Sequence, residues 1–313
     1  MFKKNIDFNK SFKPVAIVYA IIIVIGVLAS VIFGVKLDIN FKGGTVITYN
    51  YIVDEANEAV DIDAEAVKKT AEEKLGVSAT VTKGSAIAVE ANTLTVSLVK
   101  NKSVDTEAME NLTKALQEAY PKNNIVLYTS TSVSPTLATT FFLKSLAAVL
   151  LTAALVVVYV GFRFRKIGGV TAGLTALVAL VLDILVAFFA CPIFGLQIDS
   201  NFVAVVLTIL GYSLNDTIVV YDSVREYKSK ISDKSLGELV NMSLNRVKIR
   251  NIVTTTTTVL AVTTIIVVAE IYGLTSLRTF AIPMLFGLIS GCLSSLFIST
   301  PLWVLWRNKL DNK

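Results

Sequence analysis

Apolar residues are concentrated in six long runs, and polar or mixed sequence lies between them. A helix that crosses a bilayer needs about 20 predominantly apolar residues, and each run is long enough. The six predicted spans cover residues 15–35, 140–162, 170–189, 201–221, 252–271 and 279–306. The first run is too long for a signal peptide, and no A-x-A cleavage site follows it. We therefore expect an uncleaved first span in an α-helical integral membrane protein.

The segment between the first two spans, residues 36–138, has the pattern of a soluble domain. Asp63 and Asp105 are N-cap candidates for two amphipathic helices, and Gly76 suits the position after the first helix. The predicted helices are 64–75 and 106–120, and the predicted strands are 45–51, 77–82, 94–99 and 125–131. The order βαββαβ predicts an inserted α+β ferredoxin-like domain, which we expect to be a binding module.

Basic residues gather on alternate connections between the spans, and this bias sets orientation in a membrane. The two short connections on the other side carry only Arg278. The bias predicts that both termini are cytoplasmic and that the ferredoxin-like domain is extracytoplasmic. The predicted parts are an N-terminus with the first span (1–35), the domain (36–138), the other five spans (139–306) and a cytoplasmic tail (307–313).

One cytoplasmic connection carries a further helix signal. Ser235-x-x-Glu238 has the form of a capping box, and apolar residues follow it at helical spacing. We expect an amphipathic helix at about 235–249 that lies on the membrane surface, or against a partner, and leads into the fifth span.

Among the ionisable residues within or beside the spans, two carboxylates and one arginine are candidates for a functional site. Asp183 is near the middle of the third run, Asp216 is in the inner part of the fourth, and Arg250 is at the start of the fifth. A charge inside a bilayer costs roughly 2.5–3.5 kcal/mol on insertion scales, so such residues indicate a functional site. If spans four and five pack side by side, Asp216 and Arg250 lie at similar depth and can form an ion pair that protonation of Asp216 breaks.

Each of these residues also has a structural interpretation. Arg250 can be an anchor whose long side chain reaches the membrane surface, and Asp183 can be a buried polar contact between helices. The threonine run 254–258 can hydrogen-bond to its own helix. The sequence leaves these alternatives open.

Composition narrows the chemistry further. The chain of 313 residues has no histidine, which excludes an H-E-x-x-H metal site and a Ser-His-Asp arrangement, and it has no Walker-A loop. Cys191 and Cys292 lie in or beside apolar runs, which disfavours a disulfide framework. The net charge of +5 comes from residues beside the spans and does not indicate nucleic-acid binding. We expect a transport component and not an enzyme, with no cofactor and no metal.

Three motifs resemble those of SecF subunits in the SecD/SecF family, part of the resistance-nodulation-division transporter superfamily. Residues 211–226 (GYSLNDTIVVYDSVRE) are similar to the pattern G-Y-S-x-N-D-T-I-V-V-x-D-R-x-R-E. Residues 243–254 (SLNRVKIRNIVT) resemble S-I-N-Q-T-L-S-R-T-I-x-T, and residues 40–44 (NFKGG) resemble D-F-x-G-G. Within these motifs the chain departs from the family at Asn40, Ser223, Arg246 and Asn251. It also departs at Tyr227, where the family has Asn after the first motif, and at Leu182, where a His-Asp pair has lost its His.

The resemblance implies that Asp216 and Arg250 are an ion-coupling pair, with Asp183 as a supporting carboxylate. The supporting motif positions are Gly43, Gly44, Gly211, Asn215, Thr217 and Thr254. It also implies a bacterial cytoplasmic (inner) membrane location, a SecD partner, the SecYEG channel and unfolded secretory polypeptides. Protons or sodium ions would suit a site of carboxylates and hydroxyls.

The implied function is an accessory role in Sec protein export. In that role the proton-motive force, or a sodium gradient, promotes late translocation of secreted polypeptides. One alternative is a small-molecule or lipid exporter of the same superfamily, which as a six-span chain would have to dimerise. A second alternative is a non-conducting scaffold of the translocon.

Overall fold

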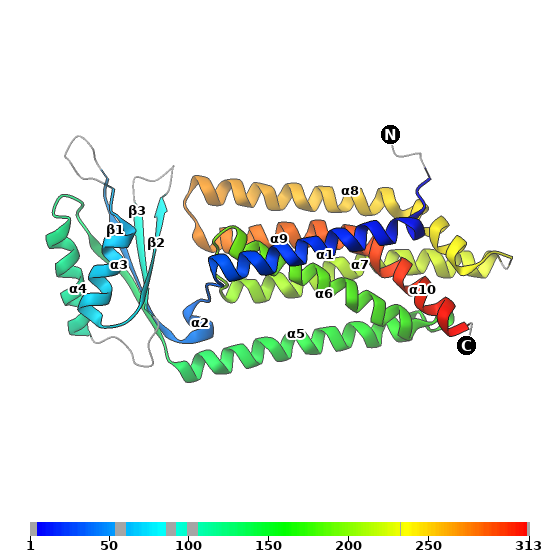
Figure 1. Ribbon diagram of the computed structural model, residues 1–313, viewed down its shortest axis with the longest axis horizontal. Coiled ribbons are helices and arrows are strands. Elements are labelled where there is room, and N and C mark those ends of the chain that lie inside the picture. The colour runs from blue at the N-terminus through cyan, green and yellow to red at the C-terminus, as the bar shows by residue number, and fades with distance from the viewer. Residues whose placement is uncertain (1–4, 54–60, 86–91, 99–105, 232, 312–313) are drawn as a thin grey trace.

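The computed structural model describes residues 5–53, 61–85, 92–98, 106–231 and 233–311. A small sheet domain lies at one end of a long bundle of helices (Figure 1). The first turns of α1 and the helix α10 lie at the opposite end of the bundle (Figure 1).

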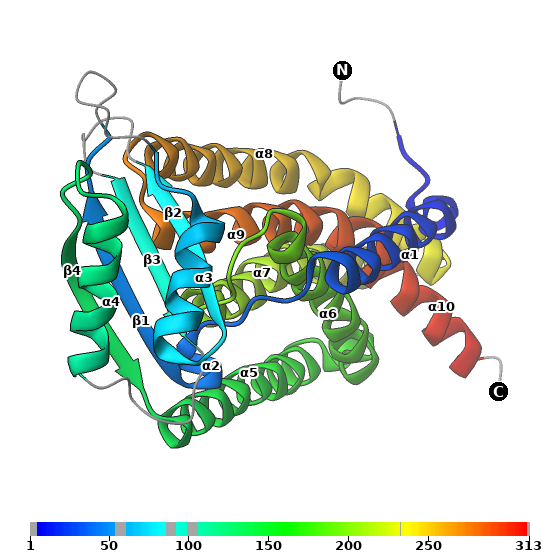
Figure 2. The ribbon, with the colours of Figure 1, turned by 60° about the vertical axis from the view of Figure 1, so that its left-hand side comes forward.

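The sheet domain has the element order β1-α3-β2-β3-α4-β4. Its elements are β1 (Gly44–Tyr51), α3 (Ala64–Leu75), β2 (Ala79–Ser85), β3 (Asn92–Leu98), α4 (Thr106–Ala119) and β4 (Val126–Val133). The strands form one antiparallel sheet in the order β2-β3-β1-β4. Both helices cover the same face of the sheet (Figure 2). This is the predicted ferredoxin-like fold.

The core of the domain lies between the sheet and its two helices, where alternate strand residues meet the apolar helix stripes. Asp63 caps α3 by accepting a hydrogen bond from the backbone N–H of Glu65 at 3.1 Å. Gly76 ends the helix in the left-handed region, with φ 63°. Both caps predicted for this helix are confirmed, whereas the predicted N-cap Asp105 lies outside the described residues.

Six helical spans in the described part of the chain are long and apolar enough to cross a membrane. They are α1 (Phe8–Phe33), α5 (Pro135–Arg163), α6 (Gly169–Ile193), α7 (Ser200–Lys230), α8 (Leu236–Ile271), and α9 (Thr275–Ser294) continued by η3 (Ser295–Ser299) and α10 (Thr300–Asp311). Each covers most of one predicted run, and the protein is a multi-pass membrane protein. Two short helices, α2 (Ile39–Lys42) and η2 (Arg165–Ile167), lie in the connections.

The centre of the bundle is formed by α6, α7 and α9, which are more buried than α1, α5 and α8. Tyr221 of α7 marks this centre, because its ring packs against Phe164 and Trp303 with centroids 5.6 and 5.4 Å apart. The apolar outer faces of α1 and α5 remain exposed, as expected for helices that meet lipid.

The helix predicted at 235–249 is present, but it is the first part of α8 and not a separate surface helix. The predicted capping box is confirmed, since Ser235 and Glu238 bond to each other's backbone N–H groups. Its apolar residues, among them Val240 and Leu244, are buried in the main core cluster with Trp303. This helix therefore buries its apolar face against protein and continues straight into the fifth span.

Gly43 and Gly44 form the turn that leads from α2 into β1, with φ 75° and 142°. A Cβ atom on Gly44 would overlap the carbonyl oxygen of Leu98, and one on Gly43 would lie 2.9 Å from Cα of Pro135. Only glycine fits this close approach. The turn thus packs the start of β1 against the beginning of the second span, α5.

Candidate functional site

The Asp183 carboxylate is fully buried in the middle of the bundle. Its Oδ2 accepts hydrogen bonds from the hydroxyls of Ser213 at 2.7 Å and Ser294 at 2.9 Å, and its Oδ1 accepts one from Ser290 at 2.6 Å. These bonds join α6 to both α7 and α9. A buried carboxylate needs such donors, because desolvation without them would strongly disfavour its charge.

A fourth helix reaches the same cluster. The Tyr19 hydroxyl of α1 donates a 2.8 Å hydrogen bond to the Ser290 carbonyl and lies 3.0 Å from the Ser290 Oγ. Gly291 allows the close packing, since a Cβ there would lie 3.0 Å from the Ser213 Cβ. The Asp183 cluster, defined as Asp183 with Ser213, Ser290, Ser294 and Tyr19, therefore connects four spans.

Asp216 has a different environment, although its side chain is also buried. Its Oδ2 has no hydrogen-bond partner among the described residues. On α8, the Thr255 hydroxyl lies near this carboxyl group without a well-formed hydrogen bond to it, and Arg250 lies within range of its charge. The Thr255 hydroxyl oxygen and the Asn251 amide nitrogen are buried and also lack a partner in the described part of the chain.

These unpartnered atoms share one interface. Asn251 and Thr255 are four residues apart and so lie on the same face of α8, which packs side by side with α7. Ser223, seven residues after Asp216 on α7, is also buried, and its hydroxyl also lacks a partner among the described residues. We call Asp216, Ser223, Asn251 and Thr255 the unpartnered polar seam. Buried polar groups normally find partners, so a seam of this kind indicates a site for water or an ion.

Arg250 lies beside the seam but is exposed. Among the described residues, no Arg250 nitrogen lies within 4.0 Å of an Asp216 carboxylate oxygen, so the two side chains do not form an ion pair. It lines a cavity of about 450 Å³ between α7 and α8, together with Ser223 and Arg246. The structure thus places the two predicted partners on adjacent helices without direct contact.

Hydroxyl groups beside the two carboxylates join α7 to the last span. Thr217 donates to the Ser295 Oγ at 2.9 Å, and Ser295 donates to the Ser213 carbonyl at 3.2 Å. Ser295 begins η3, a short π-helical segment within the last span. Such segments are rare in helices and are frequent at functional sites.

The other motif residues lie around the site without all converging on it. Gly211 and Asn215 are exposed on the outer face of α7. The Thr254 hydroxyl donates back to the Arg250 carbonyl at 2.9 Å, as the back-bonding alternative expected. Gly43 and Gly44 lie in the turn at the domain end of the bundle and do not contribute to the site.

The sequence interpretation missed the three serines around Asp183. A signal was present, since Ser290 and Ser294 are four residues apart within an apolar run and so share a helix face. Their partner could not be identified, because helix pairing is not encoded in spacing along one helix. In the described part of the chain, no three His, Cys, Asp or Glu side chains group closely enough to hold a metal ion. A cation here would depend on carboxylate and hydroxyl oxygens.

Comparisons with known proteins give a consistent result. The family described as "Protein export membrane protein SecD/SecF, C-terminal" matches residues 111–309. The SecF protein translocase subunit of Synechocystis sp. is 30% identical, covering 97% of this chain and 95% of its own length. The SecF subunit of Alicyclobacillus acidocaldarius is also 30% identical, covering 99% of this chain and 96% of its own length.

Longer proteins match as well. The SecDF protein translocase subunit of Bacillus subtilis is 34% identical over 57% of this chain, which corresponds to 24% of its own length. The crystal structure of SecDF from Thermus thermophilus, a translocon-associated membrane protein, superposes with a TM-score of 0.80 at 25% identity. That match covers 98% of this chain and 39% of the SecDF chain.

Proposed function

Because the chain belongs to the SecD/SecF family of protein export membrane proteins, we propose that it couples an ion gradient to the late translocation of secreted polypeptides. In this proposal the chain acts as an accessory subunit beside the SecYEG channel. It resides in the bacterial cytoplasmic membrane, and it moves polypeptide without a covalent reaction on its substrate.

The unpartnered polar seam is the observation that carries this proposal. Asp216 is desolvated and its Oδ2 has no hydrogen bond, so its charge depends on the neighbouring Thr255 hydroxyl and on the nearby cation Arg250. An ion that neutralises Asp216 releases Arg250, and departure of the ion restores the attraction. Moving one charge across 100 mV is worth about 2.3 kcal/mol, which is enough to shift a two-state equilibrium substantially.

The cavity between α7 and α8 gives the seam an opening. Its lining includes Ser223, which lies two helical turns, about 10 Å, from Asp216. The Ser223 hydroxyl lacks a partner in the described chain, so it can accept or donate a bond to an entering water. We assign this cavity as the cytoplasmic access to Asp216, for a proton or a sodium ion.

Asp183 takes a supporting role in this scheme. Its hydrogen bonds to Ser213, Ser290 and Ser294 are complete, so it holds the helices around the site in register. Each serine hydroxyl can rotate to a carbonyl of its own helix when the carboxylate is neutralised. Asp183 would then transmit a change at α7 to α1 and α9.

Orientation is assigned from charge. The end of α5 and the beginning of α8 lie at the end of the bundle away from the sheet domain, as do the first turns of α1 and α10 (Figure 1). These segments and η2 carry the basic residues Arg163, Lys166 and Arg246. Cytoplasmic connections are rich in Lys and Arg. We therefore place both termini in the cytoplasm and the sheet domain outside.

A SecD partner is favoured by the outer faces of α7 and α8. Thr208, Gly211 and Asn215 form an exposed small and polar stripe on α7, and Thr254 and Thr257 form a similar stripe on α8. Helices in membranes associate through small residues and hydrogen-bonding side chains, whereas a mid-span asparagine is unfavourable in lipid. We propose that SecD covers these stripes and completes the surroundings of Asp216.

Contact with secreted polypeptide is assigned to β4. This strand lies at one edge of the sheet, and its Val126, Leu127 and Tyr128 side chains are 52%, 42% and 69% exposed. An edge strand offers unpaired backbone groups, and an unfolded polypeptide can add to it as a further strand.

The experiment follows protein export into inverted membrane vesicles with and without an ion-motive force. Asp216→Asn and Arg250→Met are expected to remove the force-dependent part of export. Glu270→Gln is the matched control, because this carboxylate pairs with Arg278 at 2.8 Å outside the seam. Force-dependent export that persists in well-expressed Asp216 and Arg250 variants would support the scaffold alternative. Normal export with altered tolerance of small toxic compounds would support the exporter alternative.

A further inference from the structure

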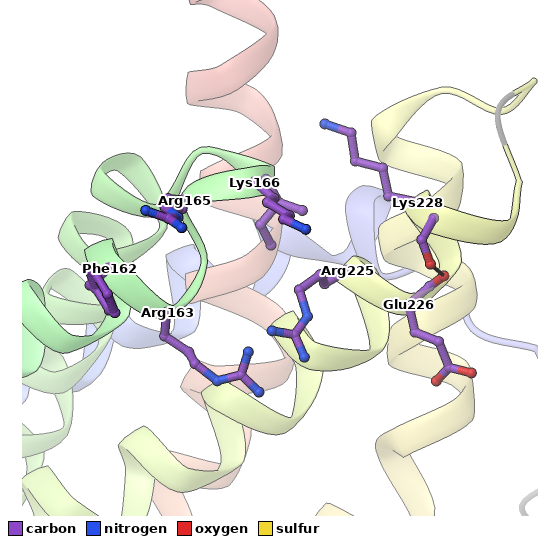
Figure 3. Close-up of a pocket in the computed structure, with 9 residues that line it drawn as sticks. Phe162, Arg163, Arg165, Lys166, Arg225, Glu226 and Lys228 are labelled. Atoms are coloured by element: carbon purple, nitrogen blue, oxygen red, sulfur yellow. Dashed lines mark hydrogen bonds between the residues drawn. The ribbon is translucent and has the colours of Figure 1, made fainter.

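A basic cavity of about 770 Å³ lies at the end of the bundle away from the sheet domain, between the end of α5, the short helix η2 and the end of α7. Five cationic side chains line it, against one carboxylate. The lining residues are Phe162, Arg163, Arg165, Lys166, Ile167, Arg225, Glu226, Lys228 and Ser229. Figure 3 shows Arg163 and Arg225 with their guanidinium groups turned toward each other.

The two arginines are held in place before any ligand binds. Both form ion pairs with the same Asp222 oxygen, Arg163 at 3.1 Å and Arg225 at 2.8 Å. Both also lie over the Phe164 ring, with guanidinium carbons 5.4 and 5.9 Å from its centroid. Two guanidinium groups that share one carboxylate keep a net positive charge, and each retains further N–H donors.

The one carboxylate in the lining does not neutralise the cavity. Glu226 accepts from Lys230 at 2.7 Å and from Arg246 at 2.8 Å, and neither of these cations lines the cavity. Figure 3 shows the Glu226 carboxylate turned away from Arg163 and Arg225. The cavity therefore favours an anion, and the planar guanidinium pair suits the oxygens of a phosphate.

An exposed apolar stripe leads directly to this cavity. On α5, Leu151, Leu155, Val158 and Phe162 are all more than half exposed, and their spacing places them along one helix face. Phe162 also belongs to the cavity lining, and the Arg165 guanidinium lies over its ring at 5.5 Å. The surface is thus apolar along the helix and basic at its end.

We propose that this cavity binds the headgroup of an anionic phospholipid, with its acyl chains along α5. A phosphate between Arg163 and Arg225 would accept hydrogen bonds from their remaining N–H groups. The acyl chains would lie along the exposed apolar stripe of α5. Basic pockets between helices at the cytoplasmic surface are suited to anionic headgroups. The lipid would join α5 to α7, the helix that carries Asp216. The proposal rests on the cytoplasmic placement of this end of the bundle.

The test is native mass spectrometry of the purified full-length chain in detergent, titrated with phosphatidylglycerol or with phosphatidylcholine of the same chain lengths. Phosphatidylglycerol is expected to bind at least tenfold more tightly. Each cation near an anionic surface contributes about a fivefold factor in affinity, so Arg165→Gln combined with Lys166→Gln should weaken binding about 25-fold. Arg163→Gln should weaken phosphatidylglycerol binding at least fivefold. This single variant provides the test if the double variant does not fold.

Lys234→Gln combined with Lys309→Gln is the matched control, since it removes the same charge at the same end of the bundle but outside the cavity, and neither lysine pairs with Glu226. Three results would overturn the proposal. They are equal binding of the two lipids, equal weakening in the control, and complete displacement of the lipid by inorganic phosphate at an equal concentration, which would indicate a site for small anions.

Discussion

The Ser213 hydroxyl donates a 2.7 Å hydrogen bond to Asp183, and Ser213 lies one helical turn before Asp216 on α7. One carboxylate is therefore bonded to the helix that carries the other. The first has a complete set of donors, whereas the second has an oxygen without a partner in the described chain. The difference supports the distinct roles that we propose, in which the satisfied carboxylate holds helices together and the unsatisfied one exchanges an ion.

Removal of one donor to Asp183 should weaken the bundle modestly. Hydrogen bonds between membrane helices contribute about 0.6 kcal/mol on average and about 1.7 at most. We expect Ser294→Ala to lower the unfolding free energy within this range, as measured by thermal inactivation in detergent. Thr263→Ala is the control, because its hydroxyl is exposed and bonds only to its own helix. An equal loss in the two variants would contradict the structural role of the Asp183 cluster.

The turn at Gly44 should tolerate no side chain. Gly44→Ala combines an unfavourable φ of 142° with an overlap on the Leu98 carbonyl oxygen, and we expect a loss of more than about 3 kcal/mol in unfolding free energy. Gly76→Ala separates these effects, since φ is 63° but nothing lies within 4 Å of the added Cβ. That control should lose only about 1 kcal/mol. Chemical unfolding of the full chain measures the loss of unfolding free energy in both variants. Similar losses in Gly44→Ala and Gly76→Ala would contradict this prediction, because they would show that the overlap with Leu98 is relieved.

Much of the fold could be predicted from the sequence, because bilayer thickness and helix capping act locally. The length of apolar runs gave the spans, and Asp63 with Gly76 gave the bounds of α3. The path of residues 235–249 could not be predicted, because their apolar stripe suits a membrane surface and a protein surface equally. Only the contact with Trp303 and its neighbours distinguishes the two.

The site was predicted in part. Asp183, Asp216 and Arg250 were singled out as candidates because charge is unfavourable in a bilayer. Ser213, Ser290 and Ser294 were missed, because a serine in an apolar run usually bonds to its own helix and carries no comparable signal. The absence of a direct Asp216–Arg250 contact depends on side-chain direction, which spacing along two helices does not give.

The sheet domain offers a test of pH dependence. The hydrogen bond from Lys83, at 2.6 Å, lowers the pKa of Asp61 below its ordinary 3.8. The contribution of this pair is therefore present above pH 3.8 and is lost as the pH falls through the lowered pKa. Exposed pairs contribute about 0.2–1 kcal/mol, so Asp61→Asn should speed hydrogen exchange of β2 amides slightly at pH 7. The difference should vanish well below pH 3.8, and a difference that persists there would contradict this assignment.

The assigned orientation predicts opposite labelling of two positions. Single cysteines at Asn92 in the sheet domain and at Lys230 should react with an impermeant thiol reagent from opposite sides of the membrane. The background lacks Cys191 and Cys292, both of which are free thiols, so their replacement by alanine breaks no disulfide. Reaction of both positions from the same side would contradict the orientation.

The central claim is that the charge state of Asp216 responds to Arg250, and infrared difference spectroscopy can follow it directly. The sample is the full chain with the proposed SecD partner, and the signal is the C=O stretch of a protonated carboxyl. We predict a band that appears as the pH is lowered, is absent in Asp216→Asn and has a changed pH dependence in Arg250→Met. Sodium at fixed pH should remove the band if sodium is the coupling ion. An identical band in wild type and Asp216→Asn, or one that Arg250→Met leaves unchanged, would contradict the account.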